Sequence, residues 1–208
     1  MSDVREAYDN WSTKYDSDRN LTRDLNSLIT KQTFVDSQFN SIVEIGCGTG
    51  KNTLFLAQIG TQVQAMDFSE AMLNKAKKKL NSDNVAFLIG DITKIWTYSD
   101  RSADLITCNL VLEHIKDLSF VFSEAFRILT AGGTFFVSEL HPFKQYTGAK
   151  ANFQNGAETV EISSYVHHIS EFFDTAKNNG FIVEDFKEWW HETDMNKLPR
   201  LATFRFRK

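Results

Sequence analysis

The sequence predicts an α/β fold in which helices cover both faces of a doubly wound parallel sheet. Strand-like and helix-like segments alternate from Ser41 through Asp185, with no internal repeat and no low-complexity tract between them. The first strand, Ser41–Ile45, is rich in β-branched residues and leads directly into a loop with three glycines, Gly46, Gly48 and Gly50. Glycine permits a tight turn and lets bare main chain approach a ligand closely. The chain is therefore expected to bind a ligand at the end of its first strand.

The remaining strands follow from short apolar runs separated by turn signals. They are expected at Thr61–Asp67, Val85–Ile89, Ala103–Cys108, Thr134–Glu139, Phe181–Phe186 and Arg200–Phe206. Helices are expected in the intervals, at about 52–58, from Ser69 onward, at 118–129 and at 169–179. Ser69 is the expected N-cap of the second helix. Glycines are expected to end the third helix, at 131–133, and the fourth, at Gly180.

The composition of the 208 residues fits a single domain with room for a large core. The formal net charge of −4 provides no general basic surface for nucleic acid, and the basic run 75–79 is expected to be a solvated helix face. No apolar run is long enough to cross a membrane, and no signal peptide is recognisable. Cys47 and Cys108 are expected to be free thiols on inner strands, which favours a cytoplasmic location.

The glycine loop carries a recognisable motif. Glu44 to Gly50 reads E-x-G-x-G-x-G, and Lys51 stands where a dinucleotide fingerprint needs its third glycine. This motif, together with those downstream, resembles the class I S-adenosylmethionine-dependent methyltransferases, within them the small-molecule group that includes the ubiquinone and menaquinone methyltransferases. The resemblance implies a three-layer α/β/α sandwich around a seven-stranded, Rossmann-like sheet whose last strand is antiparallel. It also implies S-adenosyl-L-methionine as cofactor and S-adenosyl-L-homocysteine as product.

The cofactor is expected along the carboxyl ends of the first four strands. Asp67 ends the second strand about twenty residues beyond the first glycine, where a ribose-binding carboxylate belongs. By resemblance, Met72 and its neighbours lie along the adenine, while Asp91 and Ile92 bind the adenine amino group and a ring nitrogen. The alternatives are that Met72 is an apolar core residue and that residues 91–93 form an ordinary turn. The residues expected at the cofactor are Glu44, Gly46, Cys47, Gly48, Gly50, Asp67, Phe68, Met72, Gly90, Asp91, Ile92, Asn109, Leu110 and Tyr15.

Two segments lie outside this core and are expected to select the acceptor. Residues 8–16, YDNWSTKYD, are similar to a signature that forms a mobile helical lid in many family members. Tyr8, Trp11 and Tyr15 share one predicted helix face, which either covers the cofactor or docks the helix on the sheet. The chain is thus expected to divide into a lid (1–40), a cofactor-binding core (41–140), a substrate-covering insertion (141–168) and a C-terminal helix and strand pair (169–208).

Methyl transfer from a sulfonium chiefly requires alignment of the acceptor and exclusion of water, and a base is needed only if the acceptor loses a proton. Histidine is the natural base because its pKa lies near neutrality. His141 is the first candidate, with His167 and His168 as the others, and each is equally open to a structural role. No ligand cluster predicts a metal site. The residues expected near the substrate are Tyr8, Trp11, Asn109, His141 and Tyr165.

The sequence leaves the methyl acceptor open, because oxygen, nitrogen and carbon are all methylated on this fold. A small molecule is favoured over RNA or protein, since the chain is slightly acidic. The alternatives are a nicotinamide-dependent oxidoreductase, a cofactor-binding regulator that performs no transfer, and an RNA or protein methyltransferase. Lys51 counts against the first of these. The oligomeric state is not indicated.

Overall fold

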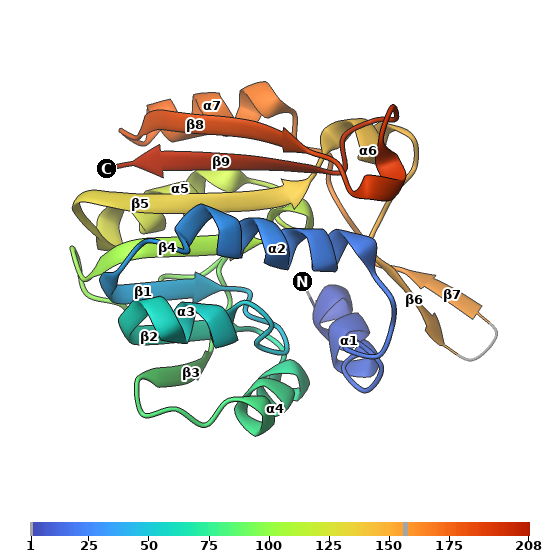
Figure 1. The fold of residues 1–208 in the computed structure, drawn as a ribbon, viewed down its shortest axis with the longest axis horizontal. Coiled ribbons are helices and arrows are strands. Elements are labelled where there is room, and N and C mark those ends of the chain that lie inside the picture. Colours follow the sequence, from blue (N-terminus) through green and yellow to red (C-terminus); the bar gives the residue numbers. More distant parts are fainter. Residues whose placement is uncertain (1, 156–157) are drawn as a thin grey trace.

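The computed structural model describes residues 2–155 and 158–208 and contains the predicted sheet (Figure 1). Its seven strands are ordered β3-β2-β1-β4-β5-β9-β8. Strands β1 to β5 are parallel, whereas β9 pairs antiparallel with both β5 and β8. The bounds are β1 Phe39–Ile45, β2 Gly60–Asp67, β3 Val85–Ile89, β4 Ala103–Asn109, β5 Leu129–Leu140, β8 Ile182–Trp189 and β9 Leu201–Arg207. The expected sheet with an antiparallel last strand is confirmed.

Helices cover both faces of the sheet and give the three expected layers (Figure 1). One layer holds α2 Leu21–Phe34, α3 Thr53–Ile59 and α4 Glu70–Lys79, and the other holds α5 Leu118–Ile128 and α7 Ile169–Asn178. In the first layer Ile29 of α2 packs in a cluster with Phe136 of β5. In the second, Phe122 of α5 packs edge-on against Phe135 and Phe206 of the sheet. Burial of such apolar side chains stabilises the fold by roughly 1.5–3 kcal/mol each.

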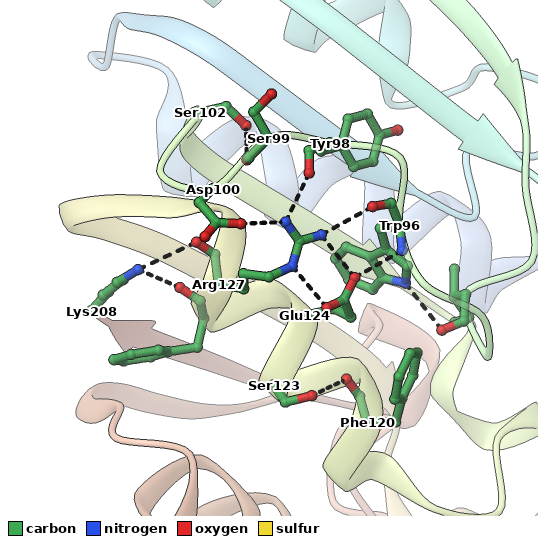
Figure 2. A network of polar contacts seen from close by, with 12 residues as sticks. Trp96, Tyr98, Ser99, Asp100, Ser102, Phe120, Ser123, Glu124, Arg127 and Lys208 are labelled. Atoms are coloured by element: carbon green, nitrogen blue, oxygen red, sulfur yellow. Dashed lines mark hydrogen bonds and ion pairs between the residues drawn. The ribbon is translucent and has the colours of Figure 1, made fainter.

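The alternation of strands and helices is interrupted between β3 and β4, where residues 90–102 form turns without a helix. Arg127, near the end of α5, organises this connection (Figure 2). Its guanidinium donates to the carbonyls of Trp96 (3.0 Å) and Tyr98 (2.8 Å) and forms ion pairs with Glu124 (2.8 Å) and Asp100 (2.7 Å). Glu124 also accepts from the backbone N–H of Trp96 (2.8 Å). Hydrogen bonds from the side chains of Arg127 and Glu124 therefore fix residues 90–102, although this connection contains no helix that could pack on the sheet.

The predicted bounds of this helix, 118–129, agree with α5 to within one residue, but the glycines at 131–133 do not cap it. The helix stops at Ile128, Leu129 has an extended backbone (φ −68°, ψ 143°), and residues 131–133 already belong to β5. The reason is strand pairing, because the N–H of Gly132 donates to the carbonyl of Lys208 at the end of the chain (2.9 Å). By contrast, Gly180 adopts φ 89° directly after α7 and ends that helix as expected.

Two segments lie over the carboxyl edge of the sheet (Figure 1). The first is α1 Ser2–Trp11, and the second is the insertion after β5, with α6 Pro142–Tyr146 and the hairpin β6 Asn152–Asn155 and β7 Glu158–Glu161. They contact each other, because the ring of Trp11 stacks on Phe153 with centroids 5.4 Å apart. The short 3₁₀ turns are η1 Leu112–His114 and η2 Glu192–Asp194. Over the described residues, no helix has both the length and the apolar character needed to cross a bilayer.

Candidate active site

A cavity lies at the carboxyl ends of β1, β2 and β4, beneath α1. Most of the residues expected at the cofactor line it, while Glu44 and Cys47 line a smaller pocket that adjoins it. Gly50 and Asp91 line neither space. The residues around the cavity are Tyr8, Tyr15, Gly46, Gly48, Asp67, Phe68, Met72, Gly90, Ile92, Asn109, Leu110, Val111, His114 and Ile115.

The three glycines of the loop serve different purposes. Gly46 has φ 67°, and a Cβ there would lie 2.2 Å from the Cγ2 atom of Val111. Gly50 packs against α4, where a Cβ would lie 3.1 Å from that of Ala76. Gly48 has φ 54°, but a Cβ there would meet no atom within 4 Å. Gly48 therefore borders open cavity space, and the other two permit close packing.

Asp67 is held by the backbone at the end of β2. Its carboxylate accepts from the N–H of Gly48 (2.8 Å) and from the N–H of Ser69 (2.9 Å). Burial raises the pKa of Asp67 to about 6, and the backbone hydrogen bonds oppose that shift. Each carboxylate oxygen can accept a further hydrogen bond from a ligand hydroxyl. Ser69 caps α4 as expected, since its hydroxyl accepts from the N–H of Met72 (3.1 Å).

The adjoining pocket contains buried polar groups without partners. Both side-chain polar atoms of Asn109 and the Oδ1 of Asn26 make no hydrogen bond to any described residue. Glu44 accepts from the hydroxyl of Thr53 (2.5 Å), and burial raises the pKa of Glu44 to about 8. Leu110, directly after Asn109, adopts φ 58°, which costs a non-glycine residue about 1–3 kcal/mol. Strain and unpaired polar atoms together mark this end of β4 as a place for a ligand.

Of the three residues that follow β3, two line the cavity and the middle one does not. Gly90 and Ile92 line the cavity, as does Met72 from α4. The Oδ1 of Asp91 instead accepts from the N–H (2.9 Å) and the hydroxyl (2.7 Å) of Thr93. Asp91 thus forms the local turn that aims the Ile92 side of the loop at the cavity.

Helix α1 and the turn that follows it are attached to the glycine loop and to α4. The hydroxyl of Ser69 donates to Asp9 (2.5 Å), and the hydroxyl of Thr49 donates to Asp16 (2.7 Å), which also pairs with Lys79. Because α1 ends at Trp11, the predicted one-face stripe does not continue to Tyr15, which lies in the following turn.

The aromatic residues of the lid nevertheless stay together. The rings of Tyr8 and Tyr15 lie 6.3 Å apart, centroid to centroid, and both line the cavity. Trp11 instead lines a second cavity, which lies between α1 and the insertion after β5.

The three histidines expected near the chemistry do not line the cavity. His141 is fully buried, where its Nδ1 accepts from the N–H of Phe143 (3.1 Å) and its Nε2 contacts Glu188 (2.8 Å). His167 contacts Glu171 through Nδ1 and the carbonyl of Ile115 through Nε2 (both 2.7 Å).

Two further predicted residues lie apart from the cavity. His168 is exposed and contacts the hydroxyl of Tyr146. Tyr165 lies in a separate surface pocket beyond His114. Over the described residues, no three His, Cys, Asp or Glu side chains gather as a metal site.

The structure brings His114 and Glu113 to the site, which the sequence reasoning did not single out. The Nε2 of His114 contacts the hydroxyl of Tyr8 (3.0 Å), and its Nδ1 contacts the carbonyl of Ser163 (2.8 Å). A carbonyl only accepts, so Nδ1 carries the proton and Nε2 accepts from Tyr8. Burial lowers the pKa of His114 and favours this neutral form. The signal in the sequence was two ionisable residues inside the apolar run 110–115.

Two buried glutamates flank this histidine. Glu113 has one carboxylate oxygen without a partner among the described residues, and burial raises its pKa to about 7. Glu139 accepts from the N–H groups of Val111 (3.0 Å) and Leu112 (2.9 Å) through one oxygen, while its other oxygen has no such partner. Burial raises the pKa of Glu139 to about 8. Asp67 lines the cavity itself, Glu44 lines the adjoining pocket, and burial raises the pKa of all four carboxyl groups, Asp67, Glu44, Glu113 and Glu139.

Comparison with known proteins agrees with this geometry. Residues 43–137 match the family described as "Methyltransferase domain". A malonyl-[acyl-carrier protein] O-methyltransferase of Hamiltonella defensa is 30% identical over 66% of this chain and 52% of its own length. A demethylmenaquinone methyltransferase of Leptospira interrogans is 30% identical over 64% of this chain and 58% of its own. The chain thus spans little more than half the length of these curated relatives.

A solved structure supports the fold over a greater length. The putative S-adenosylmethionine-dependent methyltransferase from Listeria monocytogenes superposes with a TM-score of 0.75 at 20% identity, covering 88% of this chain and 97% of that chain. The glycine motif, the sheet order with its antiparallel β9 and the matched domain are mutually consistent. Residues 43–137 therefore form a methyltransferase domain, and the chain around it has the class I fold of S-adenosylmethionine-dependent methyltransferases.

Proposed function

We propose that this protein transfers a methyl group from S-adenosylmethionine to a small-molecule acceptor by in-line displacement. The observation that carries the proposal is the cavity where the glycine loop, Asp67 and Asn109 meet beneath the lid. The cavity suits the cofactor because it combines the carboxylate of Asp67, the unpaired amide atoms of Asn109 and open space beside Gly48.

Within this proposal, each part of the cofactor has a matching set of residues. Asp67 accepts from the ribose hydroxyls, and the apolar side chains of Phe68, Met72 and Ile92 enclose the adenine. Asn109, at the boundary with the adjoining pocket, binds the amino-acid end. When bound, S-adenosylmethionine supplies an electrophilic methyl group on a sulfonium, with a thioether as leaving group.

The chain's own residues have three tasks in the transfer. The lid excludes water, since Tyr8 and Tyr15 lie directly over the cavity. The walls align the acceptor, so that its nucleophilic atom forms a bond to the methyl carbon as the carbon–sulfur bond breaks. If the acceptor has a proton to lose, the Tyr8 hydroxyl takes it while passing its own proton to Nε2 of His114, which accepts from that hydroxyl (3.0 Å). His114 is the one of the five histidines, all of them described, that lines this cavity.

The first experiment measures release of S-adenosylhomocysteine from S-adenosylmethionine, with host extract divided by ultrafiltration into small and large fractions as acceptors. Turnover with the small fraction alone is expected. Turnover with the large fraction alone would indicate an RNA or protein acceptor instead. Binding of S-adenosylhomocysteine without turnover in either fraction would favour a regulator, and binding of NADH in its place would favour an oxidoreductase.

A matched pair of glycine variants tests the position of the cofactor. Gly48 and Gly132 both have positive φ (54° and 79°), and an added Cβ would meet nothing within 4 Å at either position. Alanine at either position is expected to lower the free energy of unfolding by about 1–2 kcal/mol through backbone strain. Only Gly48→Ala is expected to weaken binding of S-adenosylhomocysteine, by about tenfold or more, because its methyl group enters the proposed cofactor space. Equal affinity in the two variants would contradict the placement.

A further inference from the structure

We propose that the methyl acceptor carries a negatively charged group, bound in the second cavity that lies between the lid and the insertion. This inference rests on the proposed function, because it names the class of molecule that the same site would take. The second cavity shares Tyr8, Tyr15 and Leu110 with the cofactor cavity, so the two cavities adjoin at these side chains and a molecule in the second lies next to the proposed cofactor. Its volume of about 380 Å³ suits a small ligand.

Basic side chains from separate parts of the chain line this second cavity. They are Arg19, Arg23, Lys144, Lys150 and Arg200. They come from the segment after α1, from α2, from α6 and the segment that follows it, and from the residue just before β9. This concentration stands out in a chain whose formal net charge is −4. Convergence of cations on one concave site creates a positive potential that favours an anion.

The carboxylates of the protein do not balance these cations. Asp194 is shared between Arg200 and Lys144, and Glu161 pairs with Lys150 (2.7 Å). Within the described part of the chain, neither Arg19 nor Arg23 forms an ion pair with a carboxylate.

The guanidinium of Arg23 illustrates the surplus. It donates to the carbonyls of Tyr15 and Asp18 and lies over the rings of Tyr15 (3.9 Å) and Trp11 (5.2 Å). Uncharged groups thus orient it, and no described carboxylate pairs with it. Asp16, the nearby carboxylate that feels this charge, is already paired with Lys79. The cavity therefore keeps a net positive charge that a ligand can neutralise.

The inner end of the second cavity has a different chemistry. Glu113 lines it, and one carboxylate oxygen of this side chain is buried and has no partner among the described residues. Such an oxygen is satisfied by an O–H or N–H donor and repels an anion. The ligand is thus oriented, with its anionic group toward the basic side chains and a proton-bearing group toward Glu113, beside Tyr8. That orientation places an oxygen or nitrogen nucleophile at the cofactor cavity.

The test uses two acids and their uncharged amides as probes, benzoate against benzamide and malonate against malonamide. Binding to the full chain is measured by calorimetry with and without S-adenosylhomocysteine. The Arg19→Gln/Lys150→Gln double variant removes two exposed rim charges that have no proposed part in cofactor binding. The control, Lys77→Gln/Lys78→Gln, removes two exposed charges from α4. Each rim cation is expected to contribute about twofold to fivefold to acid binding.

The expected result is that the acids bind and the amides bind more weakly, with the preference reduced in the rim variant and kept in the control. Equal binding of acids and amides, no binding of either acid, or equal losses in both double variants would overturn the proposal. Failure of S-adenosylhomocysteine to bind would count against the proposed function alone, because the acids are also measured without it.

Discussion

Buried polar groups have hydrogen-bond partners at the amino edge of the sheet, where the parallel strands begin, and several lack them at the carboxyl edge, where these strands end. At the amino edge of β4 and β5, Arg127 uses its N–H groups on Trp96, Tyr98, Asp100 and Glu124 (Figure 2). At the carboxyl edge, buried atoms of Asn109, Glu113 and Glu139 have no partner among the described residues.

The difference separates polar groups that hold the fold from polar groups kept for a ligand. An unsatisfied buried group costs about 1–3 kcal/mol, so a set of them at one edge is a considerable expense of stability. The exception at the amino edge is the hydroxyl of Tyr98, which has no partner in the described structure although the Tyr98 carbonyl does. The carboxyl edge is expected to respond to mutation mainly in activity, and the amino edge mainly in stability.

The largest effect is expected from His114→Gln. With the acceptor identified by the fraction assay, turnover should fall by about 10²–10⁴-fold, because the proposed proton acceptor is lost. Glutamine keeps a donor for Ser163 and an acceptor for Tyr8, so the free energy of unfolding should change by no more than about 1 kcal/mol. Steady-state kinetics and denaturant unfolding measure the two quantities.

His141→Gln is the matched control at the same edge. His141 is buried with both ring nitrogens bonded, to Phe143 and Glu188, so its replacement should lower stability and leave the turnover of folded protein unchanged. The assignment would fail if His141→Gln abolished turnover while His114→Gln retained it.

The next effect belongs to the amino edge. Arg127→Met keeps the apolar length of the side chain but leaves Glu124 and the carbonyls of Trp96 and Tyr98 without their donor. The free energy of unfolding should fall by about 2–3 kcal/mol, since hydrogen bonds to a charged group are lost in a partly buried site. Affinity for S-adenosylhomocysteine, measured by calorimetry under native conditions, should stay within about twofold, because none of the hydrogen-bond partners of Arg127 lines the cofactor cavity. A loss of affinity without a loss of stability would contradict the expectation that the amino edge affects mainly stability.

The fold could be predicted because its main signals are local. The strand Val85–Ile89 was expected at its observed bounds, and Ser69 was expected as the cap of α4. The end of α5 was expected within one residue of its observed position, but the role of its glycines was not, because Gly132 pairs with Lys208, which is distant in sequence. Local turn chemistry predicts a helix cap at these glycines, whereas long-range strand pairing makes them part of β5.

Some residues of the site could likewise be predicted from local signals, and others depend on distant contacts. Gly48, Asp67 and Asn109 directly follow or end strands, so the parallel sheet alone brings them to one edge. The histidines depend on distant partners instead. His114 is oriented by a carbonyl 49 residues away, and His141 is held by a carboxylate 47 residues away. Sequence position therefore indicated the right edge but not which histidine faces the cavity.

The smallest expected effect concerns pH and Glu139. Its pKa of about 8 in the folded protein lies above the ordinary value of 4.5, because burial disfavours the charged form. Between these two values the folded state binds more protons than the unfolded state, so stability falls as pH rises from about 4.5 to about 8. This direction is opposite to that of a carboxylate in an ion pair, such as Asp194, whose pKa is lowered by Arg200.

Glu139→Gln removes this titration while keeping an oxygen that accepts from the N–H groups of Val111 and Leu112. At pH 8 the variant should be more stable than the parent by roughly 1–2 kcal/mol, and its stability should fall less steeply between pH 5 and 8. The gain is limited because the new amide N–H₂ group is itself left without a partner. Denaturant unfolding at several pH values measures both quantities. An unchanged slope would mean that Glu139 is already ionised at little cost, and that the carboxyl edge stores less strain than its unpaired groups suggest.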